Sequence, residues 1–174
     1  MESTLQTRVN DSKTIWFLRI VATLLIVSVG IVAYRNSLSG VFLLDDHPHI
    51  IDNPAIRSFQ PISKFIFDGG LRKLPNLSFA FNYSLGGLDP IGYHYFNVGI
   101  HLLTGLSLFE LLRVTFGKPV WGELVRSNAT LCALLVACVW IAHPLNTQAV
   151  NYIVQRSELM LSLIHISEPT RLRR

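Results

Sequence analysis

The chain has 174 residues, half of them hydrophobic and only 15% charged, and its mean hydropathy is +0.40. Soluble domains carry about 25% charged residues, and runs of about 20 apolar residues match the ~30 Å hydrocarbon core of a bilayer. The composition therefore predicts an all-α membrane protein. The formal charge of +4 does not indicate a nucleic-acid partner, because the basic residues flank apolar runs, where they act as topological anchors.

A polar tail, residues 1–14, precedes the first expected transmembrane helix, residues 15–34 (IWFLRIVATLLIVSVGIVAY). This run is long for the apolar region of a cleaved signal peptide, and no small-residue cleavage site follows it. Arg19 lies one turn inside the run, from where its side chain can reach the interface. The segment predicts a first membrane helix or a signal anchor.

A long polar loop is expected next, at residues 35–92, which hold five of the eight prolines. Within it, residues 62–67 (ISKFIF) carry apolar side chains at helical spacing. They fit either an interfacial helix lying on the membrane or a short buried helix.

Two more transmembrane helices are expected at residues 93–116 and 128–145. The first opens on the aromatic cluster YHYF, which is typical of a membrane interface. It also contains Glu110, for which Arg113 or Arg126 is the expected partner. Both cysteines fall in the run at residues 128–145. They are therefore expected to be small buried hydrophobic side chains and not to form a disulfide.

The basic residues also predict an orientation. They cluster around the N-terminal tail and in the short loop at residues 117–127, so both are expected in the cytoplasm. The loop at residues 35–92 then faces the periplasm of a bacterium or the lumen of a eukaryotic organelle. A multi-pass protein of the bacterial inner membrane is expected, or of the endoplasmic reticulum membrane if the source is eukaryotic.

The C-terminal part divides into two segments. Residues 146–160 are expected to form an interfacial segment and the start of a fourth span. Residues 161–171 (LSLIHISEPTR) resemble the in-frame translation of a transposase adapter used in DNA library preparation. Residues 161–174 are therefore expected to be an artefactual tail without functional meaning.

Asp45 and Asp46 are the most distinctive polar residues of the loop, at the end of the run FLL. Adjacent carboxylates are costly to bury, so they persist where they are solvated, paired, or hold a metal or a reacting hydroxyl. One of them could therefore serve as a general base. A solvated turn is the alternative.

Three blocks occur in order between residues 34 and 159: YRNSLSGVFLLDDHPHIIDNPAI, LPNLSFAFNYSLGGLDPIGYHYFNVGIHLL and IAHPLNTQAVNYIVQRSEL. They resemble the amino-terminal part of the transmembrane and tetratricopeptide-repeat family of glycosyltransferases. The residues in these blocks are most similar to those of the bacterial members. These are multi-span enzymes of the GT-C class, related to protein O-mannosyltransferases. The resemblance implies that the chain is an N-terminal fragment, inactive alone, without the later helices and 34-residue repeats.

The resemblance also implies a chemistry. The donor would be a sugar, plausibly mannose, carried on a polyprenyl phosphate in the membrane lipid, and the acceptor a hydroxyl, plausibly of a protein. Asp45 and Asp46 match the presumed active-site motif, where one acts as base and the sugar is transferred with inversion. A divalent metal is compatible with two adjacent carboxylates, but no metal ligand is assigned.

Five further residues match polar positions of the family pattern and are candidates for contacts to the carrier phosphate or the acceptor: His94, His101, His143, Arg156 and Glu158. Arg156 is the favoured phosphate contact, because a guanidinium can grip phosphate oxygens with two parallel bonds. Structural alternatives remain open: a helix–helix hydrogen bond for His101, helix termination at His143, and an ion pair between Arg156 and Glu158.

One sequence feature departs from the family pattern. Lys73-Leu74-Pro75 stands where an Arg-Pro step is usual, which weakens a site role for Arg72 and Lys73. The alternative function is a non-catalytic membrane anchor of a tetratricopeptide-repeat scaffold. Half of a transporter is disfavoured, because the sequence shows no inverted repeat.

Overall fold

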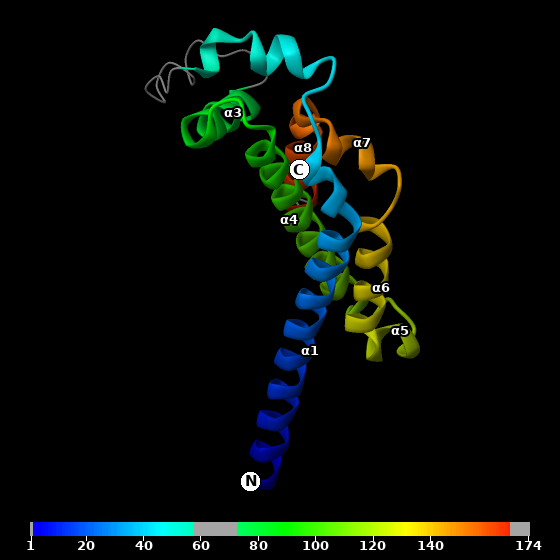
Figure 1. Ribbon diagram of the computed structural model, residues 1–174. Coiled ribbons are helices and arrows are strands. Elements are labelled where there is room, and N and C mark those ends of the chain that lie inside the picture. Colours follow the sequence, from blue (N-terminus) through cyan, green and yellow to red (C-terminus); the bar gives the residue numbers. More distant parts are fainter. Residues whose placement is uncertain (1, 58–72, 168–174) are drawn as a thin grey trace.

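The computed structural model describes residues 2–57 and 73–167, and in this part of the chain every regular element is a helix. Helix α4 (Pro90–Phe116) is central and packs against α1 (Glu2–Tyr34), α6 (Ala129–Ile141), α8 (Arg156–Ser167) and α3 (Lys73–Gly86) (Figure 1). The shorter elements are η1 (Arg35–Ser39), η2 (His47–Ile51), η3 (Pro54–Ile56), α5 (Glu123–Ser127), α7 (Asn146–Asn151) and η4 (Ile153–Gln155).

The first expected span is part of α1, which begins at Glu2 rather than at residue 15. Residues 2–14 contain neither glycine nor proline, so nothing stops a helix nucleated in the apolar run from extending toward the N-terminus. Residues 2–14 of the polar tail are therefore helical and continuous with the apolar run.

The second expected span corresponds to α4, which begins three residues before the predicted boundary. The Asp89 carboxylate accepts a hydrogen bond from the backbone nitrogen of Ile91 at 3.0 Å, and Pro90 occupies the first helical position. An acidic N-cap followed by proline is a strong start signal for a helix. The sequence-based start at residue 93, which was set at the aromatic cluster, is therefore three residues too late.

The third expected span is shorter than predicted. Helix α6 has 13 residues, a length of about 20 Å at 1.5 Å per residue, against a hydrocarbon core of ~30 Å. In the described residues, two helices are long and apolar enough to cross a membrane, Ile15–Ser39 and Pro90–Phe116. Three complete transmembrane helices are therefore not confirmed.

Helices α1, α4 and α6 meet at glycines. A Cβ atom added at Gly30 would lie 2.5 Å from Leu102 Cδ2, and one added at Gly105 would lie 2.9 Å from Ile141 Cδ1. Small residues of this kind let membrane helices approach closely. The apolar core around this contact consists of Ala22, Ile26, Phe109, Ala133, Ala137 and Ile141.

The outer faces of the same helices are apolar. Trp16 and Val32 on α1 are 65% and 66% exposed, and Val139 on α6 is 67% exposed. Soluble monomers rarely expose large contiguous apolar patches. Together with the two long apolar helices, these faces indicate association with a membrane.

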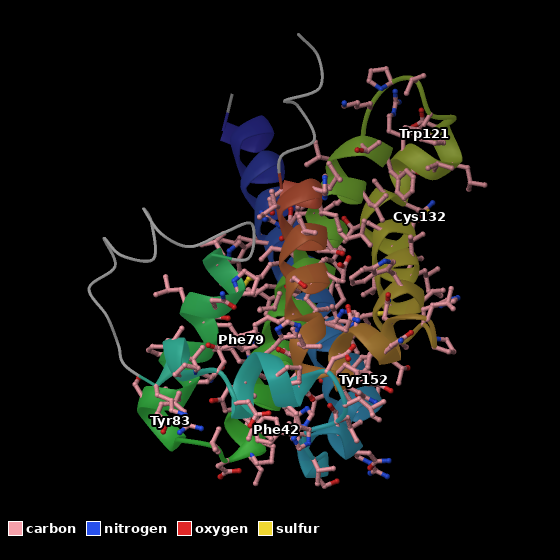
Figure 2. The ribbon with its side chains drawn as sticks, turned by 90° about the horizontal axis from the view of Figure 1, so that it is seen from above. Phe42, Phe79, Tyr83, Trp121, Cys132 and Tyr152 are labelled. Carbon is pink, nitrogen blue, oxygen red and sulfur yellow. The ribbon has the colours of Figure 1, made fainter. Side chains whose placement is uncertain are left out.

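The described part of the expected long loop forms a cap at one end of the bundle. It contains η1, η2, η3 and the unpredicted helix α3, and Phe42 and Phe79 lie on the same side of the molecule, away from Trp121 (Figure 2). The core of this cap consists of Ile50, Ile56, Phe79, Ala80, Tyr93 and Ile153. The proposed interfacial segment, residues 62–67, lies outside the described residues.

Candidate functional site

The acidic pair lies in a tight turn between η1 and η2. The Asp46 backbone nitrogen donates to Leu43 O at 2.7 Å, and the Leu43 backbone nitrogen donates to Asp46 Oδ2 at 3.0 Å. Between them, Leu44 has a φ of +30°, in the left-handed region that a branched residue rarely adopts. The turn directs Asp46 inward and leaves Asp45 on the surface.

Asp46 is completely buried and joins two distant parts of the chain. Its second oxygen, Oδ1, accepts a hydrogen bond from the backbone nitrogen of Val154, 108 residues away, at 2.8 Å. Both carboxylate oxygens thus accept backbone N–H groups, which is how proteins accommodate a buried acid. Asp46 fixes the acidic turn onto η4.

Asp45 is exposed, and in the described residues its carboxylate has no hydrogen-bond or ion-pair partner. Its lone pairs are therefore available to an incoming hydroxyl, as a general base requires. The two adjacent acids thus lie in different environments: Asp46 holds the turn, and the Asp45 carboxylate is exposed.

Arg156, the favoured phosphate contact, is instead enclosed in the cap. Nε donates to Asn97 Oδ1 at 2.7 Å, Nη1 to Ser78 Oγ at 2.9 Å, and Nη2 to Tyr93 O at 3.1 Å. The guanidinium lies 4.5 Å from the ring centroid of Phe79 and 4.5 Å from that of Phe96. Burial lowers the pKa of Arg156 to about 9, so it remains protonated at neutral pH.

Arg156 therefore has a structural position, which corrects the sequence-based interpretation. Its charge is stabilised by neutral acceptors and aromatic faces, and it is not exposed to a ligand. The alternative ion pair with Glu158 is also wrong, because the Arg156 nitrogens bind Asn97, Ser78 and Tyr93 O instead.

Asn97 continues this network on the other side of η4. Its amide nitrogen lies within hydrogen-bond distance of the carbonyl oxygens of Val150, Tyr152 and Ile153, at 3.4, 3.3 and 3.4 Å. The segment between α7 and α8 is thus held by Asp46 from the acidic turn and by Asn97 from α4. No sequence pattern predicted that these two side chains would share a partner segment.

His94 and His101 are both buried on α4. His94 Nδ1 lies 3.5 Å from Ser37 Oγ, and a Cβ atom added at Gly40 would lie 2.7 Å from His94 Nε2. His101 Nε2 donates to Ile141 O at 3.0 Å, and its ring stacks on Trp140. The structure places His94 beneath the acidic turn and gives His101 the helix–helix hydrogen bond that was its structural alternative.

His143 and Glu158 are exposed. His143 Nδ1 accepts a hydrogen bond from the backbone nitrogen of Leu145 at 3.3 Å, just after α6 ends. In the described residues, neither side chain contacts the acidic turn. Among the candidate residues in the described part of the chain, Asp45 and Asp46 thus form the turn, and His94 lies against Ser37 and Gly40, which precede it.

The predicted ion pair of Glu110 is confirmed, with Arg113 as the partner. Glu110 pairs with Arg113 at 2.8 Å, and also with Arg19 of α1 at 3.0 Å, while Arg126 pairs with Glu123 instead. Three or more metal-ligating side chains do not gather anywhere in the described part of the chain.

Comparison with known proteins gives relatives that match most of the chain. They include protein O-mannosyl-transferase TMTC4 of Homo sapiens, 28% identical over 161 residues, covering 83% of this chain and 22% of the relative. Protein O-mannosyl-transferase tmtc2 of Xenopus laevis is 31% identical, covering 80% and 17%. Protein O-mannosyl-transferase TMTC1 of Mus musculus is 33% identical, covering 83% and 16%.

The chain thus spans about a fifth or less of the length of the curated relatives that it matches. No family model and no solved structure matches it. These relatives are animal proteins, so they lend no support to the bacterial assignment, which stays a prediction. The adapter resemblance of residues 161–171 also stays a prediction, and α8 runs across its boundary without a break.

Proposed function

We propose that the chain is part of a multi-span glycosyltransferase that transfers mannose from a polyprenyl-phosphate carrier to a hydroxyl group of a protein. The names of the relatives support the sugar and the protein acceptor. The observation that carries the proposal is the division of the acidic pair: Asp46 anchors the turn through both oxygens, and Asp45 is exposed and has no partner among the described residues. The carrier is proposed from the resemblance of the sequence blocks.

In the proposed reaction, the Asp45 carboxylate accepts the proton of the acceptor hydroxyl. The hydroxyl oxygen attacks C1 of the sugar, and the bond from C1 to the carrier phosphate breaks with its electron pair on the phosphate. The configuration at C1 is inverted. Asp46 and His94 position the turn and touch no reacting atom.

The contact to the carrier phosphate is reassigned within this proposal. Arg156, His94 and His101 are buried, so they are removed from the set that binds the carrier or acceptor. His143 and Glu158 remain, because both are exposed. His143 is the proposed phosphate contact, through Nε2, which can donate while Nδ1 accepts from Leu145, and Glu158 is the proposed acceptor contact.

The proposed membrane arrangement has three crossings, with the N-terminus and residues 117–127 in the cytoplasm. The half-exposed Arg19, Glu110 and Arg113 would then lie near the cytoplasmic interface, where a partly exposed ion pair is tolerated. The cap with Asp45 would lie on the opposite side, where the lipid-linked donor is expected.

The test uses the complete product of the source gene, reconstituted with polyprenyl-phosphate mannose and an acceptor peptide. Asp45→Asn should abolish transfer, because the amide cannot accept the proton. Asp52→Asn is the matched control, an exposed aspartate of the same cap, and should keep full activity.

Two outcomes would count against the proposal. Full activity of Asp45→Asn would remove the base assignment. No transfer by the wild-type protein, together with specific binding of a partner by its repeats, would favour the non-catalytic scaffold.

A further inference from the structure

The connection between α4 and α6, residues 117–128, carries large apolar side chains that the described part of the chain leaves exposed. Val120 and Leu124 are 83% and 80% exposed, and the sequence places the exposed Trp121 between them. Three such side chains close together are unfavourable in water. The surface therefore indicates a partner, and its position along the bundle identifies which one.

Helices α1 and α4 run antiparallel. Gly30 of α1 lies against Leu102 of α4, and Arg19, earlier in α1, pairs with Glu110, later in α4. Figure 1 shows the same arrangement, with α1 continuing toward the N-terminus beyond the level of α5. Each position on α4 can therefore be matched to a height along α1.

The connection begins at the height where the apolar part of α1 begins. Phe116 ends α4 and follows Glu110 by six residues, about 9 Å at 1.5 Å per residue. Because Glu110 is level with Arg19, Phe116 is level with Lys13, where the polar tail meets the apolar run that starts at Ile15. In a bilayer this is the boundary between the hydrocarbon and the headgroups, so the connection lies in the headgroup layer.

The other side chains of the connection fit this layer. The Trp121 ring packs edge-on against Phe116, with the centroids 5.3 Å apart, and tryptophan is enriched at membrane interfaces. Lys118 is exposed, and in the described residues its ammonium has no hydrogen-bond or ion-pair partner, whereas Glu123 and Arg126 pair with each other. Lys118 is therefore available to a headgroup phosphate.

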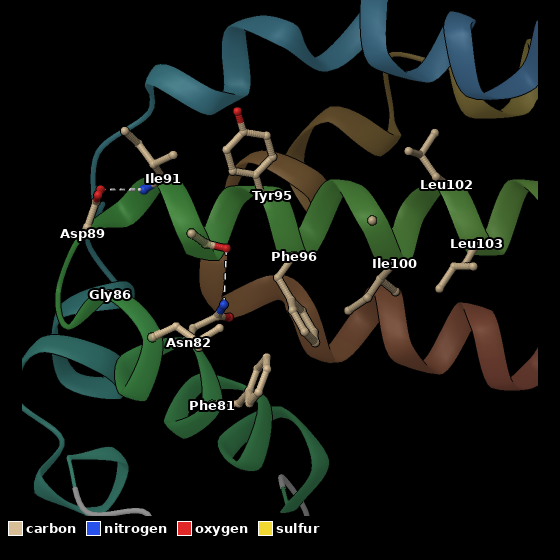
Figure 3. Close-up of a pocket in the computed structure, with 13 residues that line it drawn as sticks. Phe81, Asn82, Gly86, Asp89, Ile91, Tyr95, Phe96, Ile100, Leu102 and Leu103 are labelled. Carbon is tan, nitrogen blue, oxygen red and sulfur yellow. Dashed lines mark hydrogen bonds between the residues drawn. The ribbon is translucent and has the colours of Figure 1, made fainter.

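The apolar surface also continues along both neighbouring helices. Val114 on α4 and Leu131 on α6 are each more than half exposed. Further along α4, Leu103 lines an open apolar groove (Figure 3). These are the faces that lipid covers when α4 crosses the membrane. The same lipid then covers Val120 and Leu124, and no separate protein partner is needed.

We infer that residues 117–128 lie in the headgroup layer of one leaflet and bind phosphate-bearing lipid there. Val120 and Leu124 enter the boundary with the acyl chains, and Lys118 binds a headgroup phosphate. This contact fixes the height at which α6 begins, which matters because α6 is only about 20 Å long. The inference depends on α4 crossing the membrane and not on the proposed function.

The experiment measures quenching of tryptophan fluorescence in lipid nanodiscs, which expose both faces of the bilayer to water. The full chain has three tryptophans, and Trp16→Phe with Trp140→Phe leaves Trp121 as the sole emitter. A nitroxide near the top of the acyl chain should quench Trp121 several-fold more than one near the chain end, since interfacial segments reach about 5–10 Å into the boundary layer. Aqueous acrylamide should quench it only weakly.

A matched pair of variants tests the two sides of α5. Leu124→Trp and Glu123→Trp are each made in a chain whose three natural tryptophans are replaced by phenylalanine. Leu124→Trp should be quenched by the nitroxide lipid, and Glu123→Trp, at the adjacent residue, by acrylamide. Unchanged circular dichroism would show that both variants fold.

The phosphate contact has its own variant. Lys118→Glu should raise acrylamide quenching of Trp121 several-fold, because lipid phosphates repel the carboxylate, whereas Lys118→Arg keeps the charge and should behave as wild type. Equal acrylamide quenching of Leu124→Trp and Glu123→Trp would overturn the inference. Protection of Leu124→Trp from both quenchers would also overturn it, since a protein surface would then cover this side chain. An unchanged Trp121 in Lys118→Glu would rule out the phosphate contact.

Discussion

Asp45 and Asp46 are adjacent in the sequence but lie in opposite environments. Replacing Asp46 by Asn leaves one acceptor oxygen for two N–H donors, from Leu43 and Val154, and turns an NH₂ group toward one of them. We expect the free energy of unfolding to fall by about 1–3 kcal/mol. Asp45→Asn should change it by less than about 0.5 kcal/mol, as for other exposed sites. Unfolding of the chain in mixed detergent micelles measures both, and equal losses would show that Asp46 does not anchor the turn.

Arg156 leads to a second prediction about a single side chain. Lysine has one nitrogen and no planar face, so Arg156→Lys would leave several of the partners Asn97, Ser78 and Tyr93 O without donors. The expected loss is about 3 kcal/mol, since each buried group left unpaired costs about 1–3 kcal/mol. Proteolysis of the cap should accelerate in parallel. Arg126→Lys, at an exposed ion pair, is the control and should behave as wild type in both assays.

The long helices could be predicted from the sequence, whereas the shorter elements could not. Apolar length alone marked the parts of α1 and α4 that are long and apolar enough to cross a membrane. Helix α3 was missed because Pro75 in its first turn and the surrounding glycines suggested a loop, although proline is tolerated there. Helix α6 was predicted too long, because hydropathy does not mark a helix end and Pro144 disfavours helix in the residue before it.

The packing of α4 against α6 leads to a prediction about the contact between these two helices. Gly105→Leu would force a side chain against Ile141, and overpacking of this kind costs about 1–3 kcal/mol. Gly99→Leu, six residues earlier on the same helix, points into open space and should not destabilise the chain. Unfolding in detergent compares the two variants. A similar loss for both would indicate that the cost arises from the leucine itself and not from the contact between α4 and α6.

At the scale of the whole molecule, the family resemblance identified the polar candidate residues but not which of them are buried and which are exposed. The contact from Asp46 to Val154 spans 108 residues and the one from Asn97 to Arg156 spans 59, and no local pattern contains either. Polar side chains in a largely apolar chain tend to face the protein interior. This accounts for the burial of His94 and His101 on α4. Asp46 and Arg156 are buried in the cap through their contacts with Val154 and Asn97.

The number of membrane crossings depends on whether the short helix α6 spans the bilayer. Helix α6 is about 10 Å shorter than the ~30 Å core, so a third crossing needs help from its flanks. α5 and α7 adjoin it on either side, and a locally thinner bilayer can accommodate a short apolar helix at modest cost. The exposed Leu131, Leu135 and Val139 on α6 favour a lipid-facing position for it.

Labelling of single cysteines in sealed vesicles tests the three crossings. With Cys132 and Cys138 replaced by alanine, one cysteine is introduced at Asp52, Lys118 or Leu145, all of which are exposed. With three crossings, an impermeant maleimide should label positions 52 and 145 from one side of the membrane and position 118 only after permeabilisation. With two crossings, positions 118 and 145 would respond alike, because α6 would lie on one side of the bilayer. His143 would then be separated by the membrane from Asp45, and its proposed contact with the carrier phosphate would be lost.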